Sequence, residues 1–130
     1  MMKSVRPEVA VKRVYDAVDT TDGLRVLVDR LWPRGVRKSD LHMDMWLKNV
    51  APSPDLRNWF GHDPHRWEGF KRRYLEELED GNDDVVRLVS LAKEQHVTLL
   101  FAAHDTEHNH AIILQDFINK ALQVEGSKNR

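Results

Sequence analysis

Four cationic side chains fall within nine residues, at Arg30, Arg34, Arg37 and Lys38. Arginine binds phosphate and carboxylate groups through two parallel hydrogen bonds, so this stretch predicts a site for an anionic ligand. Trp32 lies among these cations and could stack on a base or a sugar. The alternative interpretation is a solvated basic loop, in which Trp32 fills the core and Arg30 pairs with a nearby acid.

General acid or base groups occur at two places. Asp29 precedes the cationic stretch, and Asp105, Asn109 and His110 lie near a later strand end. His110 shares a predicted helical face with apolar residues, so we expect it to point toward the sheet. We therefore take Asp29, His110 and Asp105 as candidate catalytic residues and Asn109 as a substrate-binding residue. The alternatives are a half-buried structural histidine at His110 and a helix cap at Asp105.

Histidines and aspartates in 62–65 and 104–110 are ligand types for zinc or iron. No HExxH motif is present, and side chains two residues apart on a helix diverge. The sequence therefore predicts no metal site. It predicts no cofactor either, because no P-loop, Rossmann fingerprint or GxSxG motif occurs.

The elements that position these residues are typical of an α/β fold. Residues 97–103 are apolar at nearly every position, which predicts a strand buried on both faces at the centre of a sheet. Strands are also predicted at 9–15 and 24–29. Their connector is too short for a helical crossover, so we expect an antiparallel hairpin. The prediction is one small domain with a mixed three- to four-stranded sheet covered by helices.

Helix signals occupy most of the remaining chain. Ser53-Pro54 and Asp63-Pro64 each place a capping residue before a proline at the first helical position. The predicted helices are 41–49, one starting after Ser53, 64–80, one opening at Asp83 and Asp84, and 107–123. We expect a core spanning about residues 9–123 and a tail at 124–130.

Composition limits the class of protein. The chain has 130 residues, a formal net charge of −1 and no cysteine, which excludes disulfides and thiol catalysis. Near-zero net charge argues against a surface that binds nucleic acid everywhere by charge. No stretch resembles a signal peptide or a membrane span, so we expect a cytoplasmic protein without a membrane partner.

Four segments together resemble one known family. They are KRVYD at 12–16, DGLRVLVDRLWPRGVRK at 22–38, APSPDLRNWFGHDPHRW at 51–67 and TLLFAAHDTEHNHAIIL at 98–114. In this order they are similar to the domain of unknown function 488 family, in its short, YeaO-like bacterial branch. The resemblance implies a single α/β domain and implies no established activity. Longer members carry a Cys-His-Arg-type triplet where this chain has Asn109-His110-Ala111, so thiol chemistry is absent here.

Three functions remain open from the sequence. The first is an enzyme in which Arg30 and Arg34 bind a phosphate-bearing or other anionic small molecule while His110 or Asp29 transfers a proton. The second is a regulatory or nucleic-acid-binding module without catalysis. The third is a structural or protein-interaction domain. The sequence does not decide whether residues 28–38 and 104–110 meet, and it does not give the oligomeric state.

Overall fold

The computed structural model describes the backbone of residues 8–128 and the side chains of residues 8–123. Four strands form one sheet in the order β1-β4-β2-β3, and every neighbouring pair is parallel. The strands are β1 (Ala10–Arg13), β2 (Leu24–Leu27), β3 (Met45–Trp46) and β4 (Val97–Phe101). The prediction of an α/β domain with a buried central strand near 97–103 is confirmed, because β4 lies between β1 and β2 and all its residues are buried.

The predicted hairpin is wrong. Both β1 and β2 pair in parallel with β4, so the sheet is parallel throughout and not mixed. A strand of four residues is only about 13 Å long, and the ten-residue connector can return over that distance without a helix. It does so through a single 3-10 turn, η1 (Thr20–Asp22), which Asp19 caps through a bond from the Thr21 amide.

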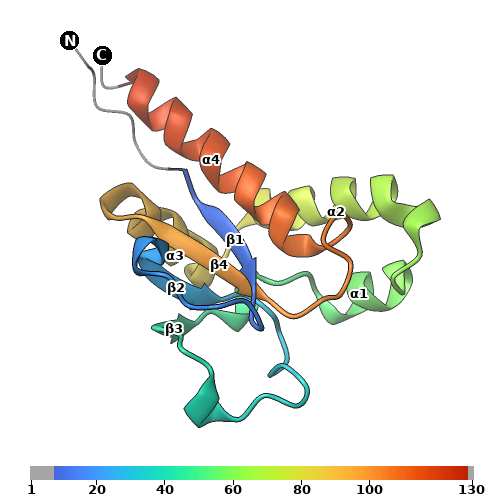
Figure 1. Ribbon diagram of the computed structural model, residues 1–130. Helices are drawn as coiled ribbons and strands as arrows, with labels where there is room; N and C mark the ends of the chain where they lie inside the picture. The colour runs from blue at the N-terminus through green and yellow to red at the C-terminus, as the bar shows by residue number, and fades with distance from the viewer. Residues whose placement is uncertain (1–7, 129–130) are drawn as a thin grey trace.

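Four α-helices cover one face of the sheet (Figure 1). They are α1 (Pro54–Phe60), α2 (Trp67–Asp80), α3 (Asp83–Glu94) and α4 (His110–Lys128). Ser53 caps α1 by accepting a bond from the Leu56 amide, as the sequence predicts. Asp63-Pro64 instead opens a 3-10 turn, η4 (Pro64–Arg66), that runs directly into α2.

The opposite face has no α-helix in the described part of the chain. The segment 30–44 lies over it and extends away from the helices (Figure 1). This segment contains a 3-10 turn, η2 (Lys38–Asp40), and leads into β3. A helix over 41–49 was predicted here and is wrong. Met45 and Trp46 pair with β2 instead, and a second turn, η3 (Lys48–Val50), follows.

Two further predictions concern α4. Its capping residue is Asn109, whose side-chain oxygen accepts a bond from the Ile112 amide, so the helix starts later than the predicted Glu107. The predicted tail begins at residue 124, yet the described backbone remains helical through Lys128. Residues 129 and 130 lie outside the described residues, as do 1–7.

Candidate functional site at the carboxyl ends of the strands

Asp29 and His110 meet where β2 and β4 end. Nε2 of His110 lies 3.6 Å from Oδ1 of Asp29, and both side chains are about five-sixths buried, with 16% and 17% exposed. The sequence prediction that His110 points toward the sheet is therefore confirmed. In an open parallel sheet this edge is where ligands usually bind.

Both side chains also hold the backbone. Oδ2 of Asp29 accepts a hydrogen bond of 3.0 Å from the Ala102 amide, and Nε2 of His110 lies 2.9 Å from the Val28 carbonyl oxygen. A carbonyl oxygen only accepts hydrogen bonds, so Nε2 must carry a proton. In the neutral ring Nδ1 is then the basic nitrogen. The pair thus ties helix α4 to the end of β2, and the end of β2 to the end of β4.

Burial shifts both groups toward their neutral forms. It raises the pKa of Asp29 above its usual value of 3.8, although the charges of His110 and Arg57 and the Ala102 amide act the other way. It lowers the pKa of His110 below 6.5, against the effect of the Asp29 charge. Tyr74 stacks edge-on against the His110 ring at 6.1 Å and is itself fully buried. These surroundings keep the pair poorly hydrated.

Arg30 follows Asp29 directly in the sequence, but its guanidinium donates mainly to backbone carbonyl oxygens. It donates to the carbonyl oxygens of Pro52 and Ala51 at 3.2 and 3.3 Å, and to the Asn49 side chain at 3.4 Å. These bonds fix the start of α1 against the end of β2. The expected pairing of Arg30 with an acid does not occur among the described residues.

The rest of the cationic stretch lies on the helix-free side. Trp32 packs edge-on against Trp46 and donates its ring N–H to the Val36 carbonyl oxygen. It thereby packs against the small apolar cluster on this face of the sheet, formed by Val14, Leu27, Leu41 and Leu100. Arg37 pairs with Asp40 at 3.1 Å on the surface. Arg34 and Lys38 are exposed, and among the described residues the Arg34 side chain forms no hydrogen bond or ion pair. The structure therefore joins Asp29 to His110 and does not join Arg34 to either.

Residues 104–110 organise their own turn. Oδ1 of Asp105 accepts bonds from the amides of Glu107 and His108, and these bonds lower the pKa of Asp105. Its Oδ2 lies 3.0 Å from Nδ1 of His108, whose ring stands edge-on to Trp67. Asn109 is 3% exposed and donates to the Asp105 carbonyl oxygen while capping α4. Asp105 and Asn109 thus shape the turn that delivers His110.

Two arginines at this edge were missed by the sequence analysis. Arg13, the last residue of β1, donates to the carbonyl oxygens of Ala103 and Ala102 at 3.0 and 3.2 Å. Arg57 on α1 lowers the pKa of both Asp29 and His110 through its charge. Arg13 lies inside the predicted strand 9–15, and only the structure shows that the strand ends at this residue. For Arg57 no local pattern exists, because only the packing of α1 brings it near the pair.

Within the described residues, three arginines around this edge form no ion pair with a carboxylate. They are Arg13, Arg30 and Arg57. The described residues also contain no group of three or more histidine or acidic side chains placed to hold a metal ion. No helix in the described part is long and apolar enough to cross a membrane.

Known proteins with similar sequences carry no stated activity. The chain is 45% identical over 107 residues to the "Uncharacterized protein YeaO" of Escherichia coli strain K12, covering 82% of this chain and 93% of that protein. It is 42% identical over 119 residues to the "Uncharacterized protein Rv3073c" of Mycobacterium tuberculosis, covering 92% and 98%. No solved structure matches the chain significantly. Residues 8–130 match the family described as "Inactive DUF488-N3 subclade". The chain therefore belongs to the DUF488 family, as a bacterial YeaO-like member of that subclade.

Proposed function

We propose that this protein is an anion-binding domain that does not itself catalyse a reaction. The observation that carries the proposal is the use of the Asp29–His110 pair as a backbone clamp, within an edge whose arginines have no carboxylate partners. Asp29 holds the Ala102 amide and His110 holds the Val28 carbonyl oxygen, so each is needed for structure. The family description as inactive supports the same conclusion.

The ligand class follows from the uncompensated charge. The one carboxylate at the centre of the edge, Asp29, is shifted toward its neutral form, whereas the nearby arginines keep their charge. Arg57 is exposed, and Arg13 uses Nε and Nη2 on backbone oxygens. A small molecule bearing phosphate or carboxylate groups would supply the missing negative charge and accept paired hydrogen bonds. A phosphate-bearing small molecule is our first choice.

Acid–base catalysis by the same pair is the second candidate. It is favoured by the position of Asp29 and His110 at the ligand-binding edge of a parallel sheet and by the shifts in their pKa values. In that case Nδ1 of His110 is the available base. Both candidate functions involve the same ligand, and they differ only in whether the protein converts that ligand chemically.

Calorimetric titration with inorganic phosphate, nucleotides, sugar phosphates and dicarboxylates tests the proposal. We expect one of these to bind, and Arg57→Gln and Arg13→Gln each to weaken binding tenfold or more. Arg72→Gln is the matched control, because Arg72 is exposed on α2 and away from this edge. The proposal fails if no anion binds, or if Arg72→Gln weakens binding equally.

Catalysis is tested on the bound ligand itself. The ligand recovered after long incubation should be unchanged by mass spectrometry and nuclear magnetic resonance. Conversion that stops in His110→Asn would establish the enzyme instead. A short single-stranded nucleic acid belongs in the same titrations, since steeply salt-dependent binding of that strand would favour the nucleic-acid-binding alternative.

A further inference from the structure

A cavity lies on the helix-free side of the sheet, and neither Asp29 nor His110 lines it. It has a volume of about 360 Å³ and is lined by residues 14–18, by Arg25 and by four residues of the 30–44 segment. The Tyr15 hydroxyl donates to the Arg34 carbonyl oxygen at 3.3 Å and so joins the two walls. This volume lies within the range of small-molecule sites, about 300–1,000 Å³.

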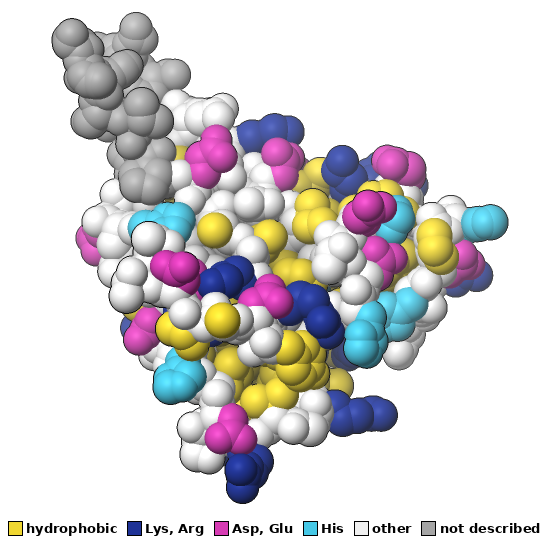
Figure 2. All heavy atoms as spheres, viewed as in Figure 1, with side chains coloured by type: hydrophobic (Ala, Val, Ile, Leu, Met, Phe, Trp, Pro, Cys, Tyr) yellow, Lys and Arg dark blue, Asp and Glu magenta, His cyan; other side chains and the backbone are white. Residues whose placement is uncertain are grey.

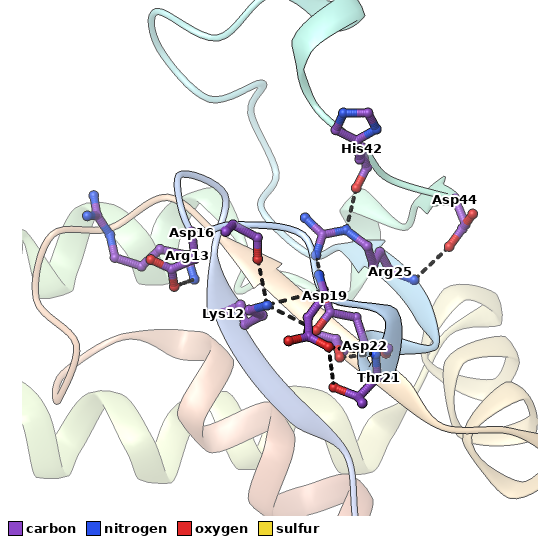
Figure 3. Close-up of polar contacts among 11 residues, drawn as sticks. Lys12, Arg13, Asp16, Asp19, Thr21, Asp22, Arg25, His42 and Asp44 are labelled. Carbon is purple, nitrogen blue, oxygen red and sulfur yellow. Dashed lines mark hydrogen bonds and ion pairs between the residues drawn. The ribbon is translucent and has the colours of Figure 1, made fainter.

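Arg25 is a buried cation with an unused donor group. It is 6% exposed, its Nη1 pairs with Asp22, and its Nε donates to the His42 carbonyl oxygen. Its Nη2 has no partner among the described residues, and Figure 3 shows one terminal nitrogen of Arg25 pointing away from both partners. Arg25 also lines the cavity. Because Nη2 is not among the buried atoms that lack a partner, it is accessible from the cavity and can donate to an acceptor bound there.

The charges beneath the cavity favour an anionic acceptor. Asp22 is shared between Arg25 and Lys12, whose Nζ lies 3.0 Å from Oδ1 (Figure 3). Burial alone would raise the pKa of Asp22, but hydrogen bonds from the Asp19 amide, Lys12 and Arg25 lower it. Asp22 is the buried carboxylate that faces these two cations, whereas Asp19, whose charge also acts on Lys12, is exposed to solvent. A ligand carboxylate on Arg25 would add a second negative charge on the buried side of the cluster.

The walls of the cavity also carry apolar and acidic side chains. Tyr15 and Val18 are each 52% exposed, and both line the cavity with Val14 and Val36. Hydrophobic side chains are visible among charged ones in the lower half of the face in Figure 2, where the 30–44 segment lies. Asp16 and Asp40 also line the cavity, so an ammonium group would find carboxylates there.

We propose that this cavity binds a small carboxylate with an apolar body, of the class of the apolar amino acids. Its carboxylate receives hydrogen bonds from Arg25, and its apolar side chain packs against Tyr15 and Val18. Its ammonium group faces Asp16 and Asp40. The cavity lining does not include Asp29, His110 or Arg57, although Arg13 of the anion-binding edge packs over the Tyr15 ring at 4.7 Å.

Amide chemical-shift mapping with three probes tests the site. L-phenylalanine carries both charged groups, 3-phenylpropionate lacks the ammonium group and phenethylamine lacks the carboxylate. We expect L-phenylalanine to bind with shifts concentrated in residues 14–18 and 35–42. The propionate should bind more weakly, and phenethylamine should not bind.

Three variants complete the test. Tyr15→Ala should weaken binding at least tenfold, whereas Leu31→Ala should leave it unchanged, because Leu31 is 62% exposed and does not line the cavity. Arg25→Lys should abolish binding, and the phenethylamine comparison tests the same contact if this variant does not fold. The proposal is overturned if L-phenylalanine produces no shifts at millimolar concentration, if phenethylamine binds equally well, or if the shifts lie elsewhere.

Discussion

Replacing Arg30 should destabilise the protein and replacing Arg34 should not, although both arginines belong to the same basic stretch. Arg30 is half-buried and makes three hydrogen bonds of 3.2–3.4 Å, two of them to carbonyl oxygens of the buried residues Ala51 and Pro52. Arg34 is exposed, and its side chain has no hydrogen bond or ion pair within the part of the chain that the structure describes. The two substitutions therefore compare a structural arginine with a surface arginine in the same loop.

The magnitude follows from these bonds. Their lengths are at the long end of the normal range, so we assign about 0.5–1 kcal/mol to each. Arg30→Ala should then lower the free energy of unfolding by about 1.5–3 kcal/mol, and Arg34→Ala should change it by less than about 0.5 kcal/mol. For a domain of this size the first change corresponds to a fall in Tm of roughly 5–15 °C.

Urea unfolding followed by circular dichroism measures both values, with the slope m checked for constancy. Leu31→Ala is a control for changes in the loop itself, since Leu31 is exposed between the two. Equal effects of the two arginine variants would refute the assignment, as would a larger effect at Arg34. Either result would mean that the 49–52 segment is not held by Arg30.

Three further predictions concern single side chains. Tyr74→Phe should lower the free energy of unfolding, measured by chemical denaturation, by about 1–3 kcal/mol. The buried hydroxyl donates at 2.6 Å to the Val50 carbonyl oxygen, which would lose its partner. An unchanged free energy of unfolding would show that the Val50 carbonyl oxygen does not accept this bond. Gly23→Ala should lower the free energy of unfolding by more than about 2 kcal/mol, because φ is +66° and an added Cβ would collide with the His96 carbonyl oxygen. Near-wild-type stability would contradict this backbone conformation at Gly23. Because the pKa of His110 is lowered below 6.5, the unfolded chain takes up its proton first, so stability should fall as pH decreases below about 6.5. His110→Asn should remove that part of the fall in unfolding titrations, and an unchanged pH profile would exclude the shift.

The sequence was informative where one local pattern determines the structure. The apolar run at 97–103 identified the central strand, and Ser53-Pro54 identified the start of α1. Spacing also placed His110 toward the sheet, where it contacts Val28. In each case burial or capping depends on residues close together in the chain.

The incorrect predictions about the sheet involve partners distant in sequence, whereas the later start of α4 depends on a local cap at Asn109. The segment 41–49 has apolar residues at helical intervals, but Met45 and Trp46 gain more by pairing with β2 and covering the second face. The order of the strands depends on β4, which nothing in residues 9–29 reveals. Likewise, Arg30 looks like a ligand-binding residue until the carbonyl oxygens of 51 and 52 are placed beside it.

The position of β4 at the centre of the sheet also determines when the protein can fold. Ala10 pairs with Thr98 and Leu24 pairs with Val97, so the two N-terminal strands do not pair with each other and share a partner near the C-terminal end. Such long loops must close before any central pairing forms, which predicts slow folding for a chain of this length. During synthesis, β1 and β2 leave the ribosome without the strand that joins them. Their unpaired edges are then exposed to other chains until residues 97–101 appear, which makes this interval the one most sensitive to aggregation.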